Sequence, residues 1–137
     1  MTTIIYFDDP ELTNDEQDIK NACIYVYQQL GFGLSELNYE KALALELRAR
    51  GYSLTTEYYV NEMFTDSKGE QHQLNQLRID VLIHKPRILL ELKTLKSKLK
   101  EDDKEYLQTK RYQKIIKSKE AFLINFGFND LEFIKIK

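Results

Sequence analysis

Two apolar segments separated by only four residues constrain the fold of this chain most strongly. LRIDVLI (77–83) and ILLEL (88–92) each have the length and the β-branched and leucine content of a buried strand. The intervening HKPR (84–87) is short and contains proline, which predicts a tight turn. A turn this short joins neighbouring strands, so the two segments are expected to pair in antiparallel fashion.

Side-chain alternation predicts which residues of these strands share a face. One face of the first strand is expected to carry Leu77, Ile79, Val81 and Ile83, and the other Arg78, Asp80 and Leu82. In the second strand one face is expected to carry Ile88, Leu90 and Leu92, and the other Leu89, Glu91 and Lys93. If the apolar faces match, two carboxylates and an amine gather on one side of the sheet: Asp80, Glu91 and Lys93.

Two helices are expected before these strands. The first begins at Asp9-Pro10 or at the capping box TNDE (13–16), and it runs to about residue 30, before the glycines of GFG. Its apolar stripe is Ile19, Cys23, Val26, Tyr27 and Leu30. Ser35 caps the second helix, which runs to about residue 50 with Tyr39, Leu43 and Leu47 on its stripe.

The remaining elements complete an α/β pattern. A strand is expected over 53–64 and a turn at DSKG (66–69), with loop or ragged strand end up to residue 76. A charged linker then precedes a helix at about 103–118 and two strands at 121–126 and 131–136. The order helix-helix-strand-strand-strand-helix-strand-strand predicts a β-sheet flanked by helices, in one domain of 137 residues.

A third carboxylate is expected to join the acidic pair. Glu36 lies on the same helical stripe as Tyr39, Leu43 and Leu47, which should face the sheet. Crowded carboxylates raise one another's pKa, and a divalent cation removes that conflict. Oxygen ligands suit Mg²⁺ or Mn²⁺, and a lysine beside such a site suits phosphodiester hydrolysis.

Simpler interpretations exist for each residue. With 13 Glu and 15 Lys, a Glu-x-Lys triplet is expected by chance about once or twice in this chain. Glu91 and Lys93 could form an exposed ion pair, and Glu36 could complement its helix N-terminus. The two histidines have no second histidine or cysteine nearby, which argues against a zinc site. The combination of Asp80, Glu91, Lys93 and an inward Glu36 favours the metal site.

The sequence also resembles the GxxExxY family, a branch of the PD-(D/E)XK nucleases. GLSELNY (33–39) carries the signature that names that family. Further matches follow in the family's order: Leu30-Gly31, KALALEL (41–47), RIDVLI (78–83), LLELK (89–93), QTKRY (108–112) and LINFG (123–127). The resemblance covers roughly residues 19–136, and residues 1–12 form an expected N-terminal extension.

This resemblance implies a restriction-endonuclease-like core with a mixed central sheet and a role for each matched residue. Asp80 and Glu91 would be metal ligands, completed by the backbone carbonyl of Leu92, and Glu36 would support the ion. Lys93 would be the catalytic lysine. Gln108 and Tyr112 would lie near the site on the helix that follows. The implied activity is Mg²⁺- or Mn²⁺-dependent hydrolysis of nucleic acid; a catalytically silent binding or assembly protein is the alternative.

Charge is distributed unevenly along the chain. Residues 1–40 carry a net charge of −7, whereas residues 85–119 carry +7. The basic segment is either a solvated helix face or a binding surface for phosphates. Its candidate nucleic-acid contacts are Lys96, Lys98, Lys100, Lys110 and Arg111. DNA is the default substrate, and RNA stays open.

The composition and the sequence of the N-terminus bear on where the protein is expected to be located. No apolar run approaches the 18 or so residues of a membrane span, the N-terminus has no signal-peptide pattern, and Cys23 has no partner for an internal disulfide. We expect an intracellular protein of the cytoplasm, nucleoid or a viral factory, not a secreted one. Expected assemblies are a homodimer or a larger repair or defence complex.

Overall fold

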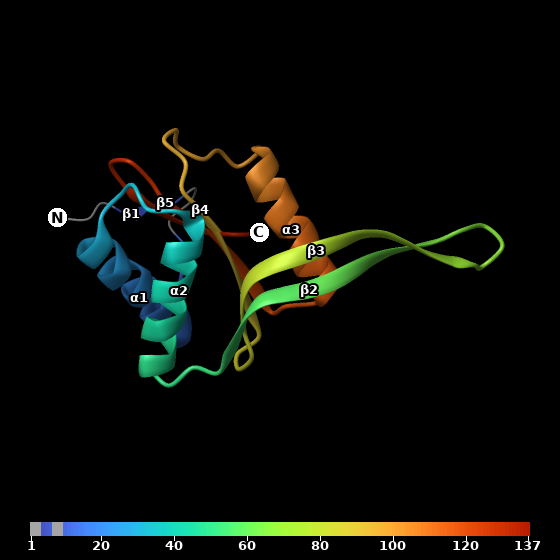
Figure 1. Ribbon diagram of the computed structural model, residues 1–137, viewed down its shortest axis with the longest axis horizontal. Coiled ribbons are helices and arrows are strands. Elements are labelled where there is room, and N and C mark those ends of the chain that lie inside the picture. The colour runs from blue at the N-terminus through green and yellow to red at the C-terminus, as the bar shows by residue number, and fades with distance from the viewer. Residues whose placement is uncertain (1–3, 7–9) are drawn as a thin grey trace.

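A six-stranded sheet with three helices organises the molecule (Figure 1). The computed structural model describes residues 4–6 and 10–137. The helices are α1 (Asn14–Leu30), α2 (Glu36–Ala49) and α3 (Lys104–Ile116). The strands are β1 (Ile4–Ile5), β2 (Leu54–Thr65), β3 (Gln71–Ile83), β4 (Ile88–Lys93), β5 (Glu120–Phe126) and β6 (Leu131–Lys135). The expected order of helices and strands is confirmed, with the short β1 in addition.

The sheet is mixed, as expected. Its strand order is β1-β6-β5-β4-β3-β2. β4 runs parallel to β5, while β3 runs antiparallel to both β4 and β2, and β5 antiparallel to β6. The fold class predicted from the sequence is therefore confirmed. None of the described helices has the length and hydropathy that crossing a bilayer requires.

The capping box begins α1. The Thr13 backbone N–H donates to Glu16 Oε1 at 3.0 Å, and the Glu16 N–H donates to Thr13 Oγ1 at 3.2 Å. Pro10 precedes the helix, and Asp9 lies outside the described residues. The prediction that Leu30 belongs to the buried stripe is wrong: it is 39% exposed, because it ends the helix beyond the edge of the core.

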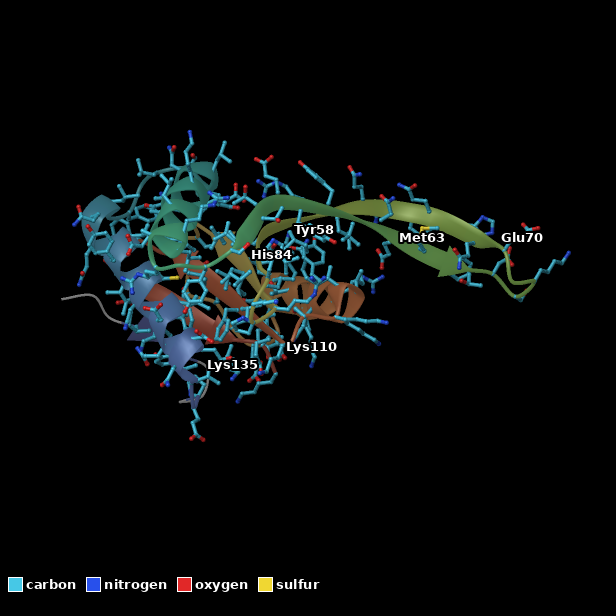
Figure 2. The ribbon with its side chains drawn as sticks, turned by 90° about the horizontal axis from the view of Figure 1, so that it is seen from below. Tyr58, Met63, Glu70, His84, Lys110 and Lys135 are labelled. Atoms are coloured by element: carbon cyan, nitrogen blue, oxygen red, sulfur yellow. The ribbon has the colours of Figure 1, made fainter. Side chains whose placement is uncertain are left out.

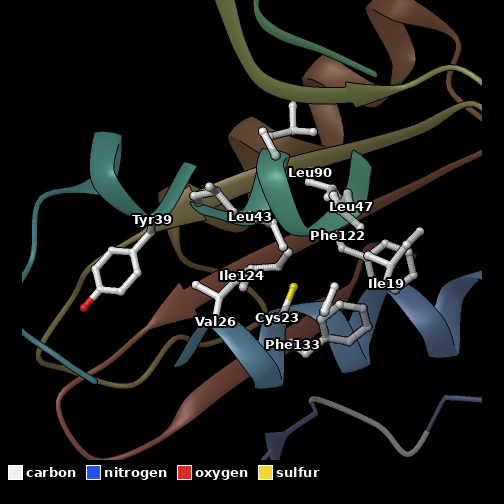
Figure 3. Close-up of a cluster of buried hydrophobic side chains, with 14 of the residues drawn as sticks. Ile19, Cys23, Val26, Tyr39, Leu43, Leu47, Leu90, Phe122, Ile124 and Phe133 are labelled. Atoms are coloured by element: carbon white, nitrogen blue, oxygen red, sulfur yellow. The ribbon is translucent and has the colours of Figure 1, made fainter. Parts of the chain in front are cut away.

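Helices α1 and α2 cover one side of the sheet. Their apolar stripes pack on side chains of β4, β5 and β6, as Figure 3 shows. The fully buried members include Ile19, Cys23, Leu43, Leu47 and Phe133. Burial of Cys23 raises the pKa of its thiol, so this cysteine is a core residue, not a nucleophile. Helix α3 covers the other side with a smaller cluster that includes Tyr106, Tyr112 and Leu123.

Strands β2 and β3 form a hairpin that extends beyond the helices (Figures 1 and 2). Of the two alternatives for the stretch up to residue 76, loop or strand end, the strand is observed, because β3 already begins at Gln71 and pairs with β2 along the outer hairpin. The turn explains this pairing. Asp66 Oδ1 accepts the N–H groups of Lys68 and Glu70, and Gly69 adopts a φ of +85°.

The alternation of faces along β3 changes at Asp80. Leu77 and Ile79 belong to the α3 side, but Val81 and Ile83 belong to the α1/α2 side, and Leu82 returns to the α3 side. The prediction that the four odd-numbered residues share one face is therefore wrong. The irregular position of Glu57 in β2, with a φ of +53°, lies between the pairs Thr56↔Val81 and Tyr58↔Ile79. The change of faces thus coincides with a backbone irregularity in the neighbouring strand, directly across from Asp80.

Burial on α2 predicts a large difference between two leucines of the same helix. Leu47 is fully buried, whereas Leu45 is 62% exposed. Replacing Leu47 by alanine is expected to lower the free energy of unfolding by about 2–5 kcal/mol, because it leaves a cavity. Leu45→Ala, the matched control, should change it by roughly 0.5 kcal/mol or less. Urea unfolding of both variants measures this; equal losses would contradict the packing described.

Candidate active site

Strands β3 and β4 separate at Asp80 and Glu91. Their paired residues run from Ile83↔Ile88 to Val81↔Leu90. At the next position, that of Asp80 and Glu91, hydrogen bonds from backbone N–H groups to the two carboxyl groups replace the backbone–backbone hydrogen bonds. The Asp80 N–H donates to Glu91 Oε1 at 3.0 Å, and the Leu92 N–H donates to Asp80 Oδ2 at 2.8 Å. The two carboxyl groups are therefore fixed against backbone at the point where the sheet divides.

Burial makes this pair unusual. Asp80 is 8% exposed and Glu91 is 3% exposed. Burial, and then the nearby Asp80 charge, raises the pKa of Glu91 to about 8. Burial also raises the pKa of Asp80, against the opposing effects of the Leu92 N–H, Arg78 and Lys93. Two adjacent buried carboxylates repel each other when both are ionised. A cation bound between them would offset that repulsion.

Helix α2 brings Glu36 to the same place. Glu36 lines a cavity of about 190 Å³ with Leu37, Glu40, Arg78 and Asp80. Its pKa is raised by partial burial and by Asp80, while Lys93 and Arg78 oppose the rise. Glu36 and Asp80 therefore line one cavity, while Glu91 is not part of its lining. The prediction that Glu36 points inward on the buried stripe is wrong: its side chain is exposed to solvent, because it belongs to the first turn of the helix.

The GxxExxY spacing has a structural basis. Gly33 adopts a φ of +115°, which favours glycine in the loop before α2. One turn into the helix, the Tyr39 hydroxyl donates to the Gly31 carbonyl and accepts the Leu34 N–H at 3.4 Å. The Tyr39 ring stacks on Phe126 at 4.5 Å between centroids. Through these contacts Tyr39 holds the loop that precedes Glu36 against the hydrophobic core.

Three charged residues of the site were missed by the sequence analysis. Arg78 donates to Asp80 and to both oxygens of Glu40, and it also contacts Glu57 Oε1 at 3.3 Å. Glu40 is four residues after Glu36, so helix periodicity could have placed both on one face. Arg78 stands two residues before Asp80 within the matched RIDVLI segment. No local pattern marks Glu57, whose side chain reaches the site through an irregular backbone.

Helix α3 approaches the acidic pair from the other side of the sheet. Tyr112 is buried, and its pKa is raised by burial and by the charges of Glu91 and Asp80. Gln108 is exposed and lines a groove of about 670 Å³ with Tyr112, Lys104 and Arg111. Tyr112 thus lies near the carboxylates, while Gln108 lies one turn away on a surface.

The loop after Lys93 is held by buried polar residues. Asn125 accepts the Leu95 N–H at 2.7 Å and donates to Glu132 Oε1 at 2.7 Å. Glu132 Oε2 accepts the Leu99 N–H at 2.9 Å. A Cβ on Gly127 would lie 2.8 Å from the Asp130 carbonyl, which explains the glycine at the end of LINFG. This network fixes the path of the basic loop.

The structure divides the predicted nucleic-acid contacts between different surfaces. All five are exposed: Lys96, Lys98, Lys100, Lys110 and Arg111. Lys96 and Lys98 line a small hollow beside the 127–130 turn. Arg111 lines the groove between α3 and the hairpin, where it pairs with Glu62. They do not form one hollow, although all belong to the same segment of the sequence.

A different group at the hairpin tip also has the composition of a metal site. Across residues 4–6 and 10–137, it is the one cluster of three ligand atoms within 4.8 Å of one another: Asp66, Glu70 and His72. Asp66 already accepts two turn N–H groups and contacts His72 Nε2 at 2.8 Å. These hydrogen bonds stabilise the hairpin turn, which explains why the three side chains lie close together.

Comparison with known proteins identifies the family. The family model described as the PD-(D/E)XK nuclease superfamily matches residues 13–136. The chain belongs to the PD-(D/E)XK nuclease superfamily. Glu36, Asp80, Glu91 and Lys93 lie within the matched range, and the finer resemblance to the GxxExxY family stays a prediction. Divalent metal ions are typical cofactors of this superfamily, which agrees with the oxygen donors of the site.

Comparison of structures agrees with that assignment at the level of the fold. The crystal structure of a protein designated SSO0001 has a TM-score of 0.55 with this chain, at 14% sequence identity. The likeness covers 98% of this chain and 67% of the other. At that identity the likeness shows a shared fold alone. None of the curated proteins compared with the chain is a significant match in sequence.

The raised pKa of Glu91 predicts how stability depends on pH. Between about pH 5 and 8, folded Glu91 keeps a proton that the unfolded chain has lost, since its pKa rises from 4.5 to about 8. The free energy of unfolding should therefore fall as pH rises, by at most ~1.4 kcal/mol per pH unit from this group. Urea unfolding of chelator-treated protein across this range measures the slope.

Two variants test whether Glu91 causes that slope. Glu91→Gln should flatten the dependence without abolishing it, because burial raises the pKa values of Asp80 and Glu36 in the same direction. Glu101→Gln, at an exposed position in the linker, should keep the wild-type slope. A wild-type stability that is constant or rises across the range would show that Glu91 is ionised in the folded protein.

Proposed function

We propose that this protein is a metal-dependent nuclease that hydrolyses phosphodiester bonds of DNA. The observation that carries the proposal is the joined pair Asp80 and Glu91, buried where β3 leaves β4, with half-buried Lys93 two residues further on. Superfamily membership supports the reaction class. The adjoining cavity, which Glu36 also lines, gives Asp80 access to solvent.

The donor atoms suit a hard divalent cation. Asp80 and Glu91 offer carboxylate oxygens as ligands, the Leu92 carbonyl would complete the set, and Glu36 would support the ion from α2. Oxygen ligands of this kind favour Mg²⁺ or Mn²⁺ over softer metals. A bound Mg²⁺ would supply a Lewis acid that polarises the phosphate and lowers the pKa of an attacking water.

The other residues act by charge and position. Lys93 raises the stability of the ionised carboxylates, as its effects on the pKa values of Glu36 and Asp80 indicate. During the reaction its ammonium would stabilise negative charge that develops on the phosphate. Tyr112 would keep Glu91 in place from the α3 side, and Gln108 would contact the substrate or its water at the edge of the groove.

DNA is proposed as the substrate on the basis of backbone contacts. Lys96, Lys98, Lys100, Lys110 and Arg111 would bind phosphates from the loop before α3 and from α3 itself. Contacts of this kind carry no sequence information and weaken steeply with salt. We therefore expect low sequence specificity for the chain acting alone.

The proposal predicts metal-dependent cleavage that the site variants lose. Wild-type protein with Mg²⁺ or Mn²⁺ should cleave at least one of linear or circular, single- or double-stranded DNA, with RNA tested beside them. Asp80→Asn and Lys93→Met should each reduce the rate by about 100-fold or more, because both remove charge from the reacting centre. Gel assays of purified protein measure this loss.

Lys119→Met is the matched control for Lys93→Met. Lys119 is exposed and lies next to the Ile88↔Glu120 end of β4 and β5, whereas Lys93 lies at the opposite end. It should keep the wild-type rate. Full activity in the Asp80 and Lys93 variants would mean a contaminant or a misplaced site. Folded wild-type protein that cleaves none of these substrates would favour a binding or assembly role.

A further inference from the structure

Arg78 is the cation that already contacts the acidic site. Its Nη1 donates to Asp80 Oδ1, while its Nη2 lies 3.0 Å from both oxygens of Glu40 and 3.3 Å from Glu57 Oε1. One guanidinium therefore links carboxylates from α2, β2 and β3. Three carboxylates around one arginine leave an excess of negative charge at the cavity.

The backbone around Arg78 is arranged to hold this contact. Glu57 has a φ of +53° in the middle of β2, a conformation that is uncommon for a residue other than glycine. It lies across from Asp80, between two regular pairs of the hairpin. Glu40 is 4% exposed, so its charge needs a partner, which Arg78 supplies.

The two ends of the guanidinium have different surroundings. Nη2 is anchored to Glu40 and Glu57, neither of which belongs to the acidic pair proposed to hold an ion. Nη1 contacts Asp80, which does belong to that pair. Arg78 also lines the cavity that leads to Asp80, together with Glu36 and Glu40. A small rotation about the anchored end would free Asp80 while the arginine stays attached.

We propose that Arg78 is a positioning residue that serves as a built-in counter-cation for Asp80, and that a divalent ion binds by displacing its Nη1 from that carboxylate. The inference rests on the proposed function, since it assumes that Asp80 is a metal ligand. Arg78 and the ion compete for the same oxygen. Arg78 thus holds the Asp80 carboxyl group in position before the ion binds, at a cost in metal affinity.

Competition and a purely structural role predict opposite results for metal binding. Replacing Arg78 by glutamine removes the competitor and leaves the carboxyl groups of Asp80, Glu40 and Glu57 in place. The dissociation constant for Mn²⁺ should therefore fall about tenfold or more, as expected for loss of one charge-assisted contact. If Arg78 only supports the fold, the same variant should bind Mn²⁺ equally or more weakly.

Isothermal titration of the full chain with Mn²⁺ makes this measurement, and near-UV circular dichroism shows that each variant is folded. Arg50→Gln is the matched control, because Arg50 also bridges two carboxylates, Asp18 and Glu46, away from the cavity. It changes the net charge equally and should leave the Mn²⁺ affinity within about twofold of the wild type, since salt screens interactions between charges that lie far apart.

Arg78→Lys covers the case in which the glutamine variant does not fold. Lysine keeps the charge but has one ammonium where arginine has two separate donors, so it cannot hold Glu40 and Asp80 in the same way. It should bind Mn²⁺ more tightly than wild type. Folded Arg78 variants with unchanged or weaker affinity would overturn the inference and leave the nuclease proposal intact. A folded wild-type protein that binds no Mn²⁺ would overturn both.

Discussion

The divergence of β3 from β4 is the feature on which the proposed site depends. A regular antiparallel ladder would pair the backbone of these strands and leave the side chains of Asp80 and Glu91 on the faces of the sheet. Instead each carboxyl group accepts a backbone N–H of the neighbouring strand. Both strands keep their other partner, since β3 pairs with β2 and β4 with β5. The sheet therefore stays intact on both sides of the gap.

Electrostatics connects this gap to the helices. Asp80 and Glu91 are buried and resist ionisation, and nearby cations, Arg78 and Lys93, offset part of that effect. Helix α2 adds Glu36 and Glu40 at the edge of the cavity, so acidic groups outnumber basic ones there. A surplus of carboxylates stabilised from several elements is costly for folding, and this arrangement is typical of a site that binds a cation.

Much of the fold could be predicted from the sequence, because local rules decide it. The Thr13 capping box, the Ser35 cap and the turn at 84–87 are present as expected. For residues 71–76 the sequence could not decide between strand and loop, since an outer hairpin with two solvent-exposed faces has no apolar alternation. The sequence also did not reveal that side chains of β3 change faces at Asp80, because the rule of strict alternation assumes a regular strand.

The site was predicted in part for the same reason. Asp80, Glu91, Lys93 and Glu36 stand in recognisable segments, and the structure brings them around one region of the sheet. Glu57 contacts Arg78 from a position where the backbone of β2 is irregular, and residue types alone do not reveal such an irregularity. The five predicted basic contacts are neighbours in sequence, but Lys96 and Lys98 line one hollow and Arg111 lines another.

The most direct test is to locate the ion. Crystals of the wild-type protein soaked in Mn²⁺ give anomalous scattering that marks each bound manganese. The central claim predicts a peak within coordination distance of the Asp80 and Glu91 carboxylates, on the side of Glu36, with Arg78 moved away from Asp80. No peak there, or one only at the Asp66, Glu70 and His72 group of the hairpin tip, would contradict it.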